Sequence, residues 1–143
     1  MYEKKIMVSG GFDPIHIGHI RMIKDAARWG TVIVTINSDE WLIRKKGYVF
    51  IPWKERAEII GNIKGVTFVT NVDDSDGTVC KAIQRHRPDA FANGGDRKKN
   101  NTPEMELCNE LDIQMLWGVG GTNKPQSSSW LVNKAMEQLN AIK

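Results

Sequence analysis

Residues 5–19 read KIMVSGGFDPIHIGH, and this stretch decides the fold. It begins with a short, mostly apolar run that is typical of a strand covered on both faces. Gly10 and Gly11 then provide a turn, and a helix is expected to begin near Ile17. A buried strand, a glycine turn and a helix in this order predict the start of a βαβ unit.

The same alternation of apolar runs and helical segments continues along the rest of the chain. Because consecutive βαβ units join by right-handed crossovers, the pattern predicts an α/β fold, specifically a Rossmann-like three-layer α/β/α domain. Its sheet is expected to be parallel. The five expected strands are residues 5–9, 31–36, 66–70, 90–92 with their neighbours, and 113–117.

Helix signals fill the intervals between these strands. Pro52 is suited to the first position of a helix, and Pro88 ends one. Thr102 followed by Pro103 reads as an N-cap and a first helical residue. A last helix is expected over residues 128–139. The apolar stripes at helical spacing are Ile20, Ile23 and Ala27; Trp53, Ala57 and Ile60; Val79, Ala82 and Ile83; and Leu131, Ala135 and Leu139.

Length and composition indicate a single globular domain. The chain has 143 residues, which suits one domain over residues 1–143. It is 41% hydrophobic and 26% charged, which excludes a disordered or fibrous protein. No apolar run reaches about 18 residues, and the N-terminus soon turns polar. We therefore expect a cytoplasmic protein that has no membrane partner.

Charge and metal-ligating residues narrow the partners further. A net charge of +3 with one short basic run is weak support for a nucleic-acid binder. Cys80 and Cys108 do not form a CxxC pair, so both are expected to be buried thiols. Three histidines without an HExxH pattern do not predict a transition-metal site built by the protein. Any metal is expected to arrive with a ligand.

The ligand site is expected at the carboxyl ends of the strands, where parallel sheets of this kind bind ligands. Gly10 and Gly11 allow close approach of the backbone, and the following helix directs its N–H groups to the same place. His16 and His19 flank Gly18 on the first helical turn and can donate hydrogen bonds to phosphate oxygens. The alternative is that the two histidines only cap the helix, but their grouping exceeds what packing requires.

The stretch GGFDPIHIGH resembles the HxGH signature, in its GxFDxxHxGH form, of the cytidylyltransferase-like nucleotidyltransferases. The resemblance implies transfer of a nucleoside monophosphate from a triphosphate to a phosphorylated acceptor, with release of pyrophosphate. It also implies Mg²⁺ bound with the triphosphate, and a homodimer. The nucleotide would be bound by Gly10, Gly11, Phe12, Asp13 and Gly18. Asp13 has two interpretations: it hydrogen-bonds backbone N–H groups of its loop, or it orients a histidine or a metal-bound water.

A second segment, residues 37–60, resembles the small sugar-phosphate and polyol-phosphate members of the family. Lys45 and Lys46 are expected in a loop after the second strand, where a basic run is otherwise usually a solvated surface. By the resemblance, one of these lysines contacts the triphosphate or the acceptor phosphate. The acceptor-binding candidates are Arg56, Trp53 and position 38 in the Ser38-Asp39 pair, and Trp41 is expected to line the same pocket.

Two later segments complete the resemblance. Gly94 and Asp96 lie in an NGGD turn after the fourth strand. The resemblance implies that this turn contacts the ribose or the base of the nucleotide. Lys124 and the serines of residues 127–129 resemble the family's ISTT or ISST segment at a helix N-terminus, which binds β- and γ-phosphates. This sequence lacks the isoleucine of that segment and has an NKP insertion before the serines.

The implied mechanism is in-line attack by an acceptor phosphate oxygen on the α-phosphorus of CTP or ATP. Catalysis would come from positioning and electrostatic stabilisation. The catalytic residues would be His16 and His19 at the bridging and non-bridging oxygens, Lys45 or Lys46 for charge neutralisation, and Ser128 with Ser127 and Ser129 at the pyrophosphate end.

Other acceptors and one other class remain open. Glycerol-3-phosphate cytidylyltransferases and heptose-phosphate adenylyltransferases are similar, but they use different bases. The Asp-Pro of GGFDPIHIGH also resembles nicotinamide-mononucleotide and pantetheine-phosphate adenylyltransferases. A catalytically silent nucleotide sensor is the alternative class. His16 and His19 argue against it, since a sensor could dispense with the second histidine.

Overall fold

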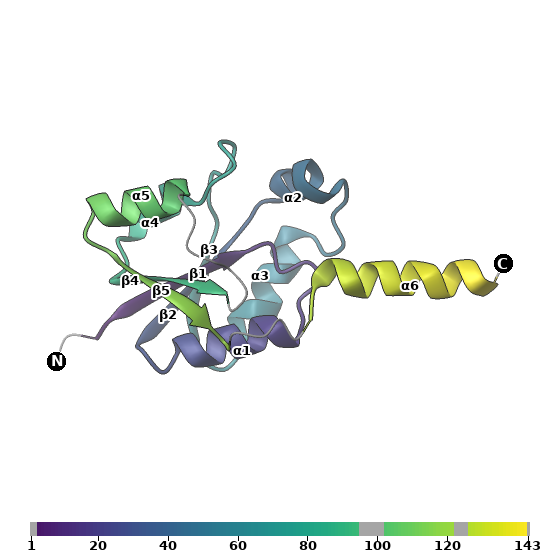
Figure 1. Cartoon of the computed structure of the whole chain (residues 1–143), viewed down its shortest axis with the longest axis horizontal. Helices are drawn as coiled ribbons and strands as arrows, with labels where there is room; N and C mark the ends of the chain where they lie inside the picture. Colours follow the sequence, from purple (N-terminus) through teal and green to yellow (C-terminus); the bar gives the residue numbers. More distant parts are fainter. Residues whose placement is uncertain (1–2, 95–101, 122–125, 143) are drawn as a thin grey trace.

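A parallel sheet of five strands forms the centre of the molecule (Figure 1). The computed structural model describes residues 3–94, 102–121 and 126–142. The strand order is β3-β2-β1-β4-β5, and every neighbouring pair is parallel. The strands are β1 (Lys5–Gly10), β2 (Thr31–Ile36), β3 (Val66–Thr70), β4 (Ala90–Gly94) and β5 (Gln114–Val119).

Side chains from both faces of the sheet are buried, which explains the continuous apolar runs in the sequence. In β1, Ile6 and Val8 join one core cluster and Met7 joins the other, and all three are at most 1% exposed. In β2, Val34 and Ile33 divide between the clusters in the same way. Successive strand residues point to opposite faces, so a strand of this composition needs a covering layer on each side.

Two pairs of helices provide these layers. They are α1 (Ile17–Ala26), α3 (Trp53–Gly61), α4 (Cys80–His86) and α5 (Pro103–Glu110). Ile23 of α1 and Ile60 of α3 pack into the first cluster, and Ile83 of α4 and Cys108 of α5 pack into the second. Figure 1 shows the two pairs on opposite sides of the sheet. This arrangement confirms the expected three-layer fold.

The two remaining helices lie outside these layers. They are α2 (Asp39–Lys46) and α6 (Ser128–Ile142). Figure 1 shows α6 projecting away from the body of the molecule. Within the described ranges, no helix is long and apolar enough to cross a bilayer.

The strand order reverses between β1 and β4, and this position locates the site. The chain builds outward from β1 through β2 to β3, then returns to the other side of β1 with β4. The helices that follow β1 and β4, α1 and α5, therefore lie on opposite faces of the sheet, and sheets of this kind bind ligands at such a point. The loop of residues 11–16 lies at this point.

Three expectations about local structure were wrong. Lys45 and Lys46 lie in the last turn of α2 rather than in a loop. The helix α2 has one buried residue, so its sequence shows no apolar stripe that would reveal it. Pro52 precedes α3 as its N-cap instead of being its first residue. Cys108 is buried as expected, but Cys80 is only half-buried.

Candidate active site

His16 and His19 lie together at the first turn of α1. The Nδ1 atom of His16 accepts a hydrogen bond from the backbone N–H of Gly18 at 3.0 Å, so His16 is the N-cap. The backbone N–H of His16 donates in turn to Nδ1 of His19 at 3.1 Å. The ring centroids are 3.8 Å apart and the planes differ by 28°. The histidines therefore do cap the helix, and they also stack on each other.

The capping bonds determine which ring atoms can donate. Because Nδ1 is the acceptor in both rings, the neutral form of each carries its proton on Nε2. Burial, followed by the charges of His16 and Lys46, lowers the pKa of His19 to about 3. His19 is therefore neutral near pH 7, with Nε2–H as a donor. A fixed neutral donor at a helix N-terminus suits a phosphate oxygen.

The glycine turn before the histidines is shaped by packing against α2. A Cβ atom at Gly11 would lie 2.8 Å from Cδ2 of Leu42, so a larger residue there would require the Leu42 side chain to shift. Phe12 is buried and has a φ of +53°, and its ring meets that of His19 edge-on at 4.8 Å. We expected the glycines to admit a ligand. For Gly11 the close neighbour is instead α2, whereas Gly10 lines the cavity described below.

Asp13 is fully buried and ties this turn to the segment that follows α2. Its two carboxylate oxygens accept from the backbone N–H groups of Phe50 and Ile51, each at 2.6 Å. Its backbone oxygen accepts from Nζ of Lys46 at 2.8 Å. Of the two interpretations of Asp13, the structure supports binding of backbone N–H groups, although these belong to a distant segment and not to its own loop.

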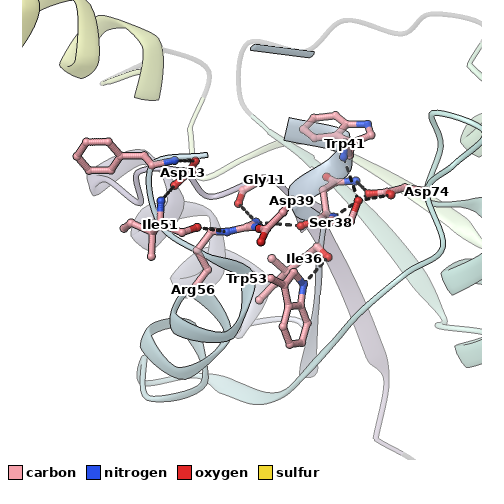
Figure 2. A network of polar contacts seen from close by, with 12 residues as sticks. Gly11, Asp13, Ile36, Ser38, Asp39, Trp41, Ile51, Trp53, Arg56 and Asp74 are labelled. Carbon is pink, nitrogen blue, oxygen red and sulfur yellow. Dashed lines mark hydrogen bonds and ion pairs between the residues drawn. The ribbon is translucent and has the colours of Figure 1, made fainter. Parts of the chain in front are cut away.

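Arg56 is 1% exposed and forms an internal brace (Figure 2). Its Nε donates to the carbonyl of Ile51, one terminal nitrogen donates to the carbonyls of Gly11 and Asn37, and the other pairs with Asp39 at 2.5 Å. The expected contact with an acceptor phosphate does not fit this position. The guanidinium is enclosed, and its donors are used by the chain itself.

The start of α2 is held by a second buried carboxylate, Asp74 (Figure 2). Its oxygens accept from Nδ2 of Asn37 at 3.0 Å, and from the backbone N–H and Oγ of Ser38 at 2.9 and 2.6 Å. The same Ser38 Oγ accepts from the N–H of Trp41 and so caps the helix. Ser38 is thus part of the scaffold of α2.

A cavity of about 530 Å³ opens beside His19 on the face of the sheet covered by α4 and α5. Trp41 and Lys45 of α2 form one wall, and Nζ of Lys45 lies 5.2 Å from the centroid of the Trp41 ring. Thr78 and Glu104, from the starts of α4 and α5, form the opposite wall. The cavity therefore offers a cation, hydroxyl and carboxylate groups next to the neutral donor His19.

The expected acceptor residues do not all line this cavity. Trp53 donates from Nε1 to the carbonyl of Ile36 at 3.1 Å and packs against the core. Together with Ser38 and Asp39 it lines a separate, smaller hollow of about 280 Å³. Lys46 donates to the backbone oxygen of Asp13, and its pKa is lowered mainly because the side chain is partly buried. Of the two lysines, Lys45 is the one that lines the cavity.

The serines at the start of α6 contact the loop before α1 and are not among the residues that line this cavity. Oγ of Ser128 donates to the carbonyl of Pro14 at 2.7 Å. The hydroxyls of Ser127 and Ser129 lie 3.0 Å apart. The starts of α1 and α6 therefore adjoin each other, and both can direct N–H groups toward an anion.

Some expected site residues fall outside the described part of the chain. Asp96 and Lys124 lie there, and Gly94 is the last residue of β4. Their assignments stay predictions. Mg²⁺ is also untested. No cluster of three or more His, Cys, Asp or Glu side chains suited to a metal ion occurs in residues 3–94, 102–121 and 126–142. Mg²⁺ prefers oxygen ligands and takes most of them from substrate phosphates and water, so Glu104, the single carboxylate among the described residues that line the cavity, suits an ion that arrives with the triphosphate.

The wall formed by α4 and α5 was missed by the sequence analysis. Thr78 and Glu104 line the cavity, yet each stands alone in the sequence without a motif, whereas Asn93, which also lines it, is the first residue of the NGGD turn. Thr102-Pro103 was recognised only as a helix start. A usable signal was the position of these residues, since a polar residue at a strand end or a helix start faces the carboxyl edge of the sheet.

The fold and the site define a class of protein. The stacked histidines lie at a helix N-terminus, at the switch point of a parallel sheet, which is where the sequence resemblance to nucleotidyltransferases implies a nucleotide site. Residues 7–134 match the family described as Cytidylyltransferase-like. The chain belongs to this family.

Individual relatives agree with this assignment. The bifunctional protein HldE of Desulfatibacillum aliphaticivorans is 31% identical over 112 residues, which are 76% of this chain and 22% of that protein. The FAD synthase of Ferroglobus placidus is 31% identical over 94 residues, covering 66% of this chain and 60% of that protein. The chain thus spans about a fifth of the first relative and under two thirds of the second.

A solved structure shares the fold. The lipopolysaccharide core biosynthesis protein from Thermoplasma volcanium superposes with a TM-score of 0.67 at 23% sequence identity. The match covers 81% of this chain and 96% of the other.

Proposed function

We propose that this protein transfers a nucleoside monophosphate from CTP or ATP to a small phosphorylated acceptor and releases pyrophosphate. The observation that carries the proposal is the stacked pair His16 and His19. The pair lies at the N-terminus of α1, and His19 faces a cavity that also holds Lys45. This arrangement supplies hydrogen-bond donors to phosphate oxygens at the start of α1, beside a cavity that holds a positive charge and has space for an acceptor.

The reaction needs no covalent enzyme intermediate. An acceptor phosphate oxygen attacks the α-phosphorus of the triphosphate, the bond to the β-phosphate bridging oxygen breaks, and pyrophosphate leaves. Nε2–H of His19 donates to an oxygen on the α-phosphate, where charge gathers in the transition state. Lys45 neutralises charge from the cavity side. Mg²⁺, bound to the triphosphate, would neutralise the leaving group.

Substrates divide between the two sides of the histidine loop. The triphosphate fits the side where the starts of α1 and α6 adjoin, with Ser127 and Ser129 near the pyrophosphate end. The acceptor fits the cavity of about 530 Å³. Thr78, Asn93 and Glu104 line it with groups that hydrogen-bond hydroxyls, which favours a sugar or polyol phosphate. The proposed enzyme acts as a homodimer.

A pyrophosphate-release assay tests the proposal. CTP and ATP, each with Mg²⁺, are combined with glycerol 3-phosphate, a heptose phosphate, nicotinamide mononucleotide, pantetheine phosphate and a flavin mononucleotide. The flavin is included because of the FAD synthase relatives. We expect pyrophosphate release with one of the two nucleotides and with one class of acceptor. Nucleotide binding without pyrophosphate release for every acceptor would instead support the sensor function.

Variants of His19 test whether this side chain contributes to catalysis. His19→Ala should lower turnover about 10²- to 10³-fold, the usual effect of removing one transition-state donor. His19→Gln keeps an acceptor for the N–H of His16, so it preserves the cap but lacks the imidazole. It should lose turnover to a similar extent while keeping its melting temperature. The matched control is His86→Ala, outside the cavity, which should retain turnover. Near-normal turnover in both His19 variants would contradict the assignment.

A further inference from the structure

The apolar face of α6 has no cover among the residues of its own chain that the structure describes. None of the residues of this 15-residue helix is buried. Met136, Leu139 and Ile142 are 55%, 62% and 81% exposed. With Val132 they follow one another at intervals of four, three and three residues, so they form one stripe along the helix.

Such a stripe requires a partner. A helix of this length is marginal in water on its own, and most of its stability must come from packing of the apolar face. In a doubly wound sheet the helix that follows the last strand normally covers that strand. Here α6 leads away from the body (Figure 1), and its start is attached to the histidine loop by the bond from Ser128 to Pro14.

The strand that α6 fails to cover retains an open groove. This groove has a volume of about 610 Å³ and lies between the end of α1 and the edge strand β5. Its apolar lining is Trp29, Met115, Leu116, Trp117 and Val119. Trp29 is 55% exposed, although a tryptophan offers a large apolar area for burial. The groove and the stripe are thus two apolar surfaces of one chain, and each lacks a cover.

We propose that α6 of one copy occupies the β5 groove of a second copy, and that the exchange is reciprocal. Within a single chain, α6 is directed away from its own groove (Figure 1). A second copy related by a two-fold axis satisfies both surfaces at once, as in exchange of an identical element between protomers. This interface specifies how the proposed homodimer forms, and it does not depend on the proposed reaction.

The size of the contact predicts how tightly the copies associate. A helix of 15 residues is about 22 Å long and about 10 Å wide, so each contact covers roughly 220 Å² per surface. Two reciprocal contacts, counted on both partners, reach roughly 900 Å², which is below the standard size of specific interfaces and in the range of weak, transient ones. The dimer should therefore dissociate on dilution.

Sedimentation velocity over a wide concentration range tests the association. Leu139→Asp places a carboxylate in the stripe and should weaken the dimer at least about tenfold, because the charge would be buried in an apolar groove. Asn140→Asp adds the same charge one residue further on, off the stripe, and serves as the matched control. Trp29→Glu should weaken the dimer as Leu139→Asp does. A wild-type chain that is monomeric at every concentration would overturn the proposal.

Cross-linking distinguishes the occupants of the groove. A photoreactive residue at position 139 is introduced into an isotopically light chain, which is mixed with a heavy chain and irradiated. Cross-links from the light residue to heavy peptides that contain Trp29 or Trp117 are expected. Cross-links confined to the light chain would mean that α6 covers its own groove. Cross-links to heavy α6, with a dimer insensitive to Trp29→Glu, would mean that the helices pair with each other. Either result would overturn the proposal.

Discussion

His19 uses its two ring nitrogens for two different tasks. Nδ1 accepts the N–H of His16 and completes the cap of α1, which leaves the proton on Nε2. Burial and neighbouring positive charge keep the ring neutral by lowering its pKa to about 3. The same contacts that stabilise the helix start therefore also fix the tautomer that donates to phosphate.

The lowered pKa of His19 predicts a pH dependence of stability. Below the unfolded value of about 6.5, the unfolded chain takes up a proton that the folded chain does not, so the free energy of unfolding falls as the pH falls toward 3. Between pH 7.5 and pH 5 this should amount to up to about 2 kcal/mol. Urea denaturation of wild type and His19→Gln at both values measures it. Equal losses in the two proteins would show that His19 is not the group responsible.

Thr35 carries an unsatisfied hydroxyl in the middle of β2. The side chain is fully buried, and Oγ1 is the buried side-chain polar atom without a hydrogen-bond partner in the described residues. Thr35→Val replaces this hydroxyl with a methyl group of similar size. It therefore removes the cost of burying a polar group that has no hydrogen-bond partner. The free energy of unfolding should rise by about 1 kcal/mol. Chemical denaturation measures the change, and a decrease of similar size would contradict the account.

Among the elements, α2 depends most on polar anchors. Leu42 is its one buried residue, so apolar packing holds it weakly. Asp74 fixes its start through Ser38, and Asp13 fixes its end through Lys46 and the segment after it. Two buried carboxylates therefore place Trp41 and Lys45 at the cavity.

Replacement of Asp74 tests this dependence. Asp74→Asn leaves one acceptor oxygen where two served three donors, and should cost about 2 kcal/mol of stability. It should also raise KM for the acceptor more than it lowers kcat, because α2 bears the cavity wall. Asp73→Asn is the matched control, since Asp73 is exposed and pairs with Lys81 at the surface. An unchanged KM for the acceptor would show that α2 does not contribute to acceptor binding.

At the scale of the whole molecule, the switch point of the sheet gathers segments that are distant in the chain. The loop after β1, the helix after β2 and the starts of α4, α5 and α6 all meet there. A ligand that bridges them links both layers of helices to the sheet. Its binding should therefore stabilise the fold as a unit.

Thermal unfolding with nucleotides tests this linkage and identifies the base. At about 100 times its Kd, a nucleotide that binds the folded chain alone adds about 2.7 kcal/mol of stability. With Mg²⁺ present, CTP or ATP should raise Tm by several degrees, and the other should have a smaller effect. EDTA should remove most of the shift if the ion travels with the triphosphate. A shift that persists in EDTA would contradict the need for Mg²⁺.

The order of elements and the position of the histidine pair could both be predicted from the sequence. Buried parallel strands and helix starts are encoded by neighbouring residues, so the run from β1 through GGFDPIHIGH to α1 could be interpreted locally. The expected end of β1 and the expected start of α1 agree with the structure within one or two residues. The expectation that Lys45 and Lys46 lie in a loop failed because α2 has almost no apolar face to mark it.

The tertiary structure alone decided which polar residues face a ligand and which hold the scaffold. Arg56 and Asp13 stand in motif-like positions, yet both are buried. Asp13 accepts from backbone N–H groups 37 and 38 residues away in sequence, and Arg56 donates to backbone carbonyls 5, 19 and 45 residues away and pairs with Asp39. The far wall of the cavity and the direction of α6 likewise follow from how whole elements pack. Contacts at such separations depend on the positions of elements in space, and no local pattern of residues records them.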